Sequence, residues 1–139
     1  MIDLDHPPPD AEKTRTCLLW KRGIVCGRFL PGVEVELEDA IENIRVTAQL
    51  TEGKRLPIMV DLRAVRSQSA DARAYLAGQE ATRVSLAVAL IIRSPVSRML
   101  GNFYLGFNRP EVPTRLFTSV AEAEDWLSTY LGEGSHARA

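Results

Sequence analysis

Serine, arginine and carboxylate side chains are the groups that could do chemistry in this chain, because histidine is almost absent. The sequence has 139 residues and two histidines. His6 precedes three prolines and His136 lies in the last four residues, so we expect both outside the folded body. A body without histidine argues against Ser-His and Cys-His catalysis and against the usual zinc and non-haem iron sites. We therefore predict neither a metal nor a cofactor.

Carboxylates are the remaining route to acid–base catalysis. Asp61 ends a short apolar stretch, and Asp71 and Glu80 follow on the next predicted helix. No spacing pairs two of these acids as an acid and a base. We expect a protein that is not an enzyme, with carboxylate-based chemistry as the less favoured alternative.

The composition is typical of one ordinary globular domain. Hydrophobic residues make up 45% and charged residues 25% of the chain, and the net charge of -1 gives no reason to expect nucleic acid as a partner. The longest apolar run, 86–92, is strand-sized and no apolar leader is present, so we expect neither a membrane span nor export. Cys17 and Cys26 are then expected to be reduced thiols. These features favour a bacterial cytoplasmic protein.

Apolar periodicity predicts alternating strands and helices in the order ββαβαβαβα. This order implies an α/β fold with a mixed, mostly parallel sheet of about five strands, covered by helices and containing one antiparallel hairpin. We expect a flexible proline-rich leader at 1–15, a single domain at 16–132 and a flexible tail at 133–139. The predicted elements are a hairpin at 17–21 and 24–30, helices at 37–51, 70–80, 95–107 and 120–131, and strands at 57–61, 86–92 and 115–118.

Helical spacing also predicts which helix faces are buried. One face of the first helix is apolar: Leu37, Ile41, Ile44 and Ala48. The third helix has a comparable stripe: Val96, Met99, Leu100, Phe103 and Phe107. Asn108 can close that helix in the left-handed conformation, and Arg109 can reach its last carbonyls. The segment from Asn102 to Arg109 fits either a structural or a partner-binding role. Trp20 fits either the core or an exposed anchor on the hairpin.

Polar and basic residues gather where the predicted parallel strands end. The strands ending at Asp61, Ile92 and Thr118 would meet at one edge of the sheet, where open α/β sheets usually bind ligands. Ser69 and Ser94 would cap the helices that begin at this edge. The candidate site comprises Asp61, Arg63, Arg66, Ser67, Ser69, Arg93, Ser94 and Arg98.

Two interpretations of this edge stay open. The arginines and helix starts suit an anionic or lipid-like ligand or a phosphoserine, whereas capping serines and solvated arginines would explain the same residues without a ligand. The charge layout is also uneven, with eight arginines against four acids at 61–115 and six acids against one arginine at 34–52. Such a layout suits docking through complementary faces, including a homodimer, and equally suits solvated helix faces.

Several short motifs resemble a known family. Val60-Asp61-Leu62-Arg63, Ser69-Ala70-Asp71-Ala72-Arg73 and the segment 101–110, with Leu116-Phe117-Thr118 and Trp126-Leu127, look like a family of small uncharacterised bacterial STAS-like proteins. The order of elements over residues 16–131 resembles the STAS-like (SpoIIAA-like) fold of anti-sigma-factor antagonists. This resemblance implies a regulatory protein that binds other proteins.

In those antagonists, a partner kinase phosphorylates a serine at the start of the corresponding helix, within Asp-Ser-Ser-Gly or Asp-Ser-Thr-Gly. The segment here is Arg66-Ser67-Gln68-Ser69-Ala70-Asp71, which keeps a serine near that position but lacks the preceding acid and the following glycine. The resemblance implies Ser69 and Ser67 as candidate phosphorylation sites. It also implies a protein partner, such as a regulatory kinase or a sigma-pathway-like protein. We expect docking through the loop and helix start at 61–73, with a small anionic or lipid-like ligand at the arginine-rich edge as the alternative.

Overall fold

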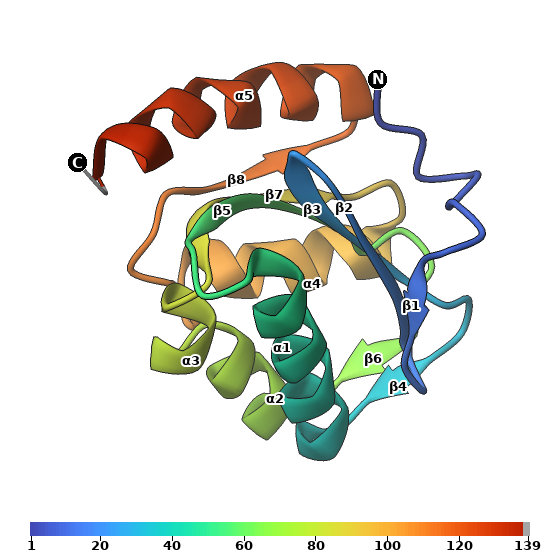
Figure 1. Ribbon diagram of the computed structural model, residues 1–139. Coiled ribbons are helices and arrows are strands. Elements are labelled where there is room, and N and C mark those ends of the chain that lie inside the picture. The colour runs from blue at the N-terminus through green and yellow to red at the C-terminus, as the bar shows by residue number, and fades with distance from the viewer. Residues whose placement is uncertain (138–139) are drawn as a thin grey trace.

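The central sheet of the protein has six strands in the order β1-β2-β3-β5-β7-β8. The computed structural model describes residues 1–137 (Figure 1). β2 runs antiparallel to β1 and β3, whereas β3, β5, β7 and β8 run parallel, so the predicted mostly parallel sheet with one hairpin is confirmed. The strands are β1 (Glu12–Lys13), β2 (Cys17–Arg22), β3 (Ile24–Phe29), β5 (Leu56–Asp61), β7 (Ser85–Ile91) and β8 (Thr114–Phe117).

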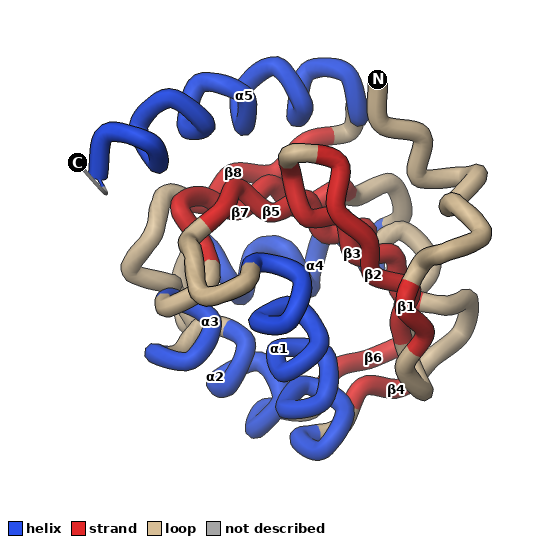
Figure 2. Tube along the Cα trace, viewed as in Figure 1, coloured by secondary structure: helices blue, strands red, loops and turns tan. Residues whose placement is uncertain are grey.

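Helices cover both faces of the sheet. Four helices lie on one face and the last helix crosses the other, as Figure 1 and the tube in Figure 2 show. The first group is α1 (Leu37–Thr51), α2 (Ala70–Leu76), α3 (Gln79–Thr82) and α4 (Pro95–Leu105), and the opposite helix is α5 (Val120–Ala137). Each face has its own apolar cluster, one around Leu62, Leu90 and Leu100 and the other around Met59, Ala89 and Leu127. This burial of strand residues on both faces explains the continuous apolar character of β7.

Two of the predicted helices have different extents in the structure. The helix expected at 70–80 is interrupted at Ala77 and Gly78, which separate α2 from the four-residue α3. The last helix passes Gly132 and continues to Ala137, which takes up most of the expected tail at 133–139. Residues 138–139 of that tail lie outside the described part of the chain.

A two-stranded parallel sheet adds a feature that the sequence pattern did not predict. It pairs β4 (Glu34–Val35) with β6 (Ser67–Gln68), immediately before α1 and α2. The Ser69 amide also donates to the Val35 carbonyl at 2.9 Å. The starts of α1 and α2 are therefore fixed to each other by backbone hydrogen bonds.

The N-terminal segment packs against the sheet, unlike the flexible leader that its prolines suggest. Ile2 and Leu4 are buried in the cluster that contains Trp20 and Leu127, so Trp20 belongs to the core. The Ile2 amide donates to Glu124 Oε1 of α5 at 2.9 Å, and β1 pairs with β2. Apolar side chains ahead of the prolines provide the burial that orders this segment.

The buried face of α1 is turned away from the predicted apolar face. Ile41 and Ala48 are exposed, whereas Ala40, Asn43 and Thr47 are buried. Asn43 Nδ2 donates to Thr16 Oγ1 at 3.0 Å and Thr47 Oγ1 donates to the Asn43 carbonyl at 2.8 Å. Because these bonds satisfy the buried polar groups, this face can turn inward although it is less apolar.

Candidate functional site

The carboxyl ends of the parallel strands meet at one edge, as predicted. Asp61 lies opposite Ile91 on the neighbouring strand, and Ile91 lies opposite Phe117 on the next. The backbone of the candidate residues leaves the sheet at this edge. Their side chains, however, separate into distinct groups with different partners.

Asp61 and Arg63 form a buried ion pair that closes the loop after β5. Asp61 Oδ2 accepts from Arg63 Nη2 at 2.8 Å, and Oδ1 accepts from both Nε and the backbone amide of Arg63 at 2.9 Å. Arg63 Nη2 also binds Asp5 Oδ1 at 2.9 Å, which attaches the N-terminal segment. The hydrogen bond to Asp61, together with the charges of both acids, raises the pKa of Arg63. Because the two side chains satisfy each other, neither is free to hold a ligand.

Ser67 and Ser69 lie on the short segment between that loop and α2. Ser67 is part of β6, and Ser69 Oγ accepts from the Ala72 amide at 3.1 Å as the predicted helix cap. Both serines are half-buried. Arg66 is exposed and pairs with Glu34 Oε2 at 3.7 Å. Since α2 has only seven residues, its dipole adds little to any anion site.

Ser94 is a helix cap at the start of α4. Its Oγ accepts from the Ser97 amide at 3.1 Å, and buried Ser97 Oγ accepts from the Arg93 and Ser94 amides at 2.8 and 2.9 Å. The Ser97 amide is therefore already occupied and Pro95 has no amide hydrogen, so the start of α4 offers few donors to an anion. Arg93 and Arg98 are exposed, and within residues 1–137 neither forms a salt bridge.

The outer face of α4 and the residues just after it carry large apolar side chains that are exposed to solvent. Leu100 and Tyr104 point into the core, and Gly101 lies so close to β8 that an added Cβ would be 2.7 Å from Leu116 Cδ2. The predicted apolar stripe was therefore only partly correct, because several members face solvent. The exposed fractions are 42% for Val96, 54% for Met99, 41% for Leu105 and 86% for Phe107. We call these four residues the α4 patch.

Arg73 connects the 61–73 segment to α4. Its guanidinium lies 4.0 Å from the centre of the Phe103 ring, and Nη1 donates to the Gln68 carbonyl at 2.6 Å. Nε also donates to Asn108 Oδ1 at 3.3 Å. Asn108 does not adopt the left-handed conformation that the sequence suggested for it. Within the described chain, Glu52 is the non-glycine residue with positive φ. The 30-residue separation of Arg73 and Phe103 gave no local signal for this contact.

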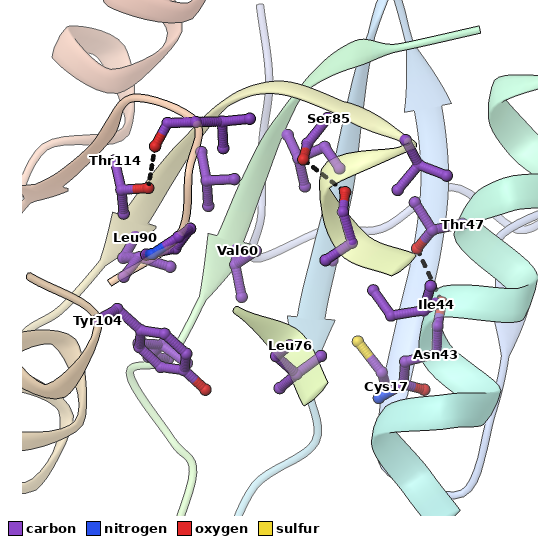
Figure 3. A pocket seen from close by; sticks show the side chains of 18 of the residues that line it. Cys17, Asn43, Ile44, Thr47, Val60, Leu76, Ser85, Leu90, Tyr104 and Thr114 are labelled. Carbon is purple, nitrogen blue, oxygen red and sulfur yellow. Dashed lines mark hydrogen bonds between the residues drawn. The ribbon is translucent and has the colours of Figure 1, made fainter. Parts of the chain in front are cut away.

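A separate cavity of about 100 Å³ lies between the sheet and helices α1–α4. Figure 3 shows its walls, with Val60 and Leu90 from the sheet, Thr47 from α1, Leu76 from α2 and Tyr104 from α4. None of the eight candidate residues lines this cavity. The arginine-rich edge and the cavity are therefore two different places in the fold.

The two cysteines have no features of activated nucleophiles. Both are free and buried, and burial raises the pKa of the Cys26 thiol to about 12 and that of Cys17 further. A thiol that stays protonated at neutral pH is a weak nucleophile. In the described part of the chain, no three His, Cys, Asp or Glu side chains gather in a way that could hold a metal ion. Among helices within residues 1–137, none has the length and apolar character needed to cross a membrane.

A family described as a domain of unknown function, DUF7793, matches residues 18–131. No curated protein matches the chain.

Several solved structures resemble this protein, among them the following two. One is an uncharacterised protein of the DUF3478 family with a SpoIIAA-like fold from Shewanella loihica PV-4, at 14% identity and a TM-score of 0.58, covering 80% of this chain and 91% of that one. The other is an anti-sigma factor antagonist from Mycobacterium paratuberculosis, at 16% identity and a TM-score of 0.60, covering 81% of this chain and 93% of that one. The expected STAS-like, SpoIIAA-like fold is thereby confirmed.

Proposed function

This chain belongs to the DUF7793 family, and we propose that it is a non-enzymatic regulatory module that docks a protein partner. The docking surface consists of the loop and helix start at 61–73 together with the α4 patch. One similar solved structure is an anti-sigma factor antagonist, whose name describes action on another protein. We place the module in the cytoplasm, where such a partner would be met.

The exposed α4 patch is the observation that supports docking best. Four large apolar side chains on and just after one eleven-residue helix are exposed, including Phe107 at 86%. Large exposed apolar patches commonly mark protein interaction sites, and the exposure of four such side chains over twelve residues supports a site here. The Arg73–Phe103 contact and the Tyr104–Gln68 hydrogen bond attach this helix to the 61–73 segment. A partner could therefore contact both parts in a fixed relative position.

The charge around this surface supports a partner with acidic residues. Arg93 and Arg98 lie at the start of α4 and form no salt bridge with the side chains described at 1–132, and exposed Arg109 lies two residues after Phe107. A partner with an apolar centre and acidic residues at its rim would complement this arrangement. Arg63 and Arg66 are already paired with acids, which weakens the strand edge as a site for a small anion and favours a protein partner.

Phosphorylation of Ser69 or Ser67 is the proposed regulation of docking. A phosphate at Ser69 would replace a helix cap and add negative charge beside Arg66 and Arg73. The added charge would change both the position of α2 and the electrostatic match with an acidic partner. A regulatory kinase of the same system would supply the phosphate.

Pull-down from the native cell, combined with intact-mass analysis, tests this proposal. We expect the wild-type chain to capture a specific protein and Ser69→Asp to reduce capture by at least about tenfold. Ser67→Asp tests the second candidate serine, and Ser128→Asp on α5, on the opposite face of the sheet, is the matched control. Equal capture by all the variants, with no phosphorylated mass in native material, would overturn the switch.

A homodimer is the competing occupant of the α4 patch. Light scattering distinguishes a second copy of this chain from a different protein as the occupant. If the wild-type chain is a dimer and Phe107→Ser is a monomer, the patch is the dimer interface. A monomer at all accessible concentrations supports docking of a different protein.

A further inference from the structure

We propose that the cavity between the sheet and helices α1–α4 binds a small, neutral, mostly apolar molecule with one hydrogen-bond acceptor. The side-chain amide of Gln68 would donate to that acceptor. Gln68 lies on the 61–73 segment and its side chain lines the cavity behind that segment, but the site does not depend on the proposed function.

The cavity exists because the helices leave the middle of the sheet uncovered. Val60 on β5 and Val88 on β7 belong to central strands, yet both are only half-buried. The opposing wall consists of Asn43 and Thr47 on α1 and of α3, a four-residue helix without a buried side chain. Protein interiors are normally close-packed, so an apolar space of this size at the centre of a domain requires an explanation.

Most polar groups on the wall are already satisfied by the protein itself. Figure 3 shows three of these bonds: Thr47 Oγ1 donates to the Asn43 carbonyl at 2.8 Å, Ser85 Oγ to Ala81 at 2.6 Å and Thr114 Oγ1 to Val112 at 3.0 Å. Thr82 Oγ1 donates to the Gly78 carbonyl at 3.0 Å in the same way. The hydroxyl hydrogens therefore do not point to a ligand.

Gln68 is the exception. Its side chain lines the cavity, is 5% exposed, and accepts a 2.6 Å hydrogen bond from the Tyr104 hydroxyl through Oε1. Among buried side chains in the described residues, Gln68 Nε2 is the polar atom without a hydrogen-bond partner. An unpaired buried donor is costly, and such groups in native proteins usually have a partner. The Tyr104 bond fixes the amide, so Nε2 is held ready to donate.

The wall chemistry limits the ligand. No charged side chain lines the cavity, so an ionised ligand would lose its hydration without compensation. Water is a poor occupant of the apolar part of the cavity, between Val60, Val88 and Leu90, because a buried water needs two to four polar partners. An engineered apolar cavity of about 150 Å³ holds benzene, so a space of about 100 Å³ suits a ring of about six non-hydrogen atoms. A small cyclic ketone, aldehyde or ether has these properties.

The partly exposed section of the wall indicates the entrance. Leu76, Ala81, Thr82 and Pro110 are half-buried lining residues on α2, α3 and the segment that joins α4 to β8. A molecule would enter between α3 and that segment. Ala81 is a small side chain at this position, so a larger residue there should obstruct the entrance without crossing the core.

Titration of the full-length chain with two isosteric probes tests the site. Cyclopentanone and methylenecyclopentane share their shape, but only the ketone accepts a hydrogen bond. We expect both probes to give saturable nuclear magnetic resonance shifts at Val60 and Val88, and cyclopentanone alone to move the side-chain amide signals of Gln68. The double variant Gln68→Leu/Tyr104→Phe removes the proposed donor and the hydroxyl that holds it in place. It should lower the affinity for cyclopentanone relative to that for methylenecyclopentane by roughly tenfold, the effect of one hydrogen bond.

Ala81→Phe is the matched control, because a larger side chain on α3 should obstruct the entrance of the cavity while Gln68 is unchanged. It should abolish the response to both probes. Absence of saturable shifts with either probe in the wild-type chain would overturn the proposal. An unchanged ratio of the two affinities in the double variant would overturn the role of Gln68. Partner capture is measured separately, so failure here leaves the docking proposal unaffected.

Discussion

At the scale of single residues, the ion pair of Asp61 and Arg63 determines what the strand edge can do. Asp61 is buried and Arg63 is partly buried, and the arginine reaches Asp5 on the N-terminal segment. The pair thus joins β5, the following loop and residues near the start of the chain. A carboxylate used in this way stabilises the loop and does not supply acid–base chemistry.

Removal of the arginine should reveal this structural role. In Arg63→Gln, the buried Asp61 carboxylate loses its charged partner, and we expect the free energy of unfolding to fall by about 3 kcal/mol in urea denaturation. Asp5→Asn removes only the exposed end of the network and should cost less than about 1 kcal/mol. Small, equal losses in both variants would contradict the structural role of the pair.

At the scale of elements, the N-terminus of α1 should show a defined pH dependence. Asp39 accepts from Arg15 Nε at 2.7 Å and from the Glu36 amide at 2.9 Å, and the hydrogen bond from Arg15 holds the carboxyl pKa below 3.8. Folding therefore favours the ionised form. This stabilisation is complete above the unfolded pKa and is lost as pH falls through the lower folded pKa.

Asp39→Asn should therefore be less stable than wild type at neutral pH by about 1 kcal/mol, a typical effect of a helix cap. The difference should stay constant down to the unfolded pKa of 3.8 and shrink only below it. Glu38→Gln, an exposed neighbour on the same turn, controls for loss of a charge. Urea denaturation at several pH values measures this, and a difference that persists unchanged in acid would rule the explanation out.

The two faces of α4 should respond differently to truncation. Leu100 is 2% exposed and Met99 is 54% exposed, although they are adjacent in sequence. Leu100→Ala should reduce the free energy of unfolding by about 3 kcal/mol because it leaves a cavity in the core. Met99→Ala should change it by less than about 0.5 kcal/mol. Thermal or urea denaturation checks both values, and a large loss in Met99→Ala would mean that the outer face is packed.

The elements show which parts of the fold the sequence could predict. The hairpin and the helix starts at Ser69 and Ser94 were predicted correctly, because each depends on residues close in the chain. The prediction of which face of α1 is buried was wrong, because the long-range hydrogen bond from Asn43 to Thr16 helps to decide that face. The short β4–β6 sheet also pairs distant residues, and two-residue strands have no detectable period.

At the scale of the whole molecule, the two sides of the sheet have different roles. α5 and the N-terminal segment close one face around Leu127 and Trp20. The opposite face holds the cavity, and the outer side of its helix α4 exposes apolar side chains. The sequence predicted the strand edge as the site because most of the chemically suggestive residues lie there. The exposure of the α4 patch and the cavity between the sheet and helices α1–α4 both depend on how the helices are oriented. Apolar periodicity alone did not predict those orientations.

Site-specific photo-crosslinking in the native cell tests the docking surface most directly. A benzophenone amino acid would replace Phe107 in one variant and Met99 in another, both in the α4 patch. A third variant would carry it in place of Ile41 on α1, an apolar residue outside the patch that is 43% exposed, against 54% for Met99. We predict that positions 107 and 99 crosslink to the same protein partner and that position 41 does not. Crosslinking at position 41 with none at 107 or 99 would contradict docking through α4.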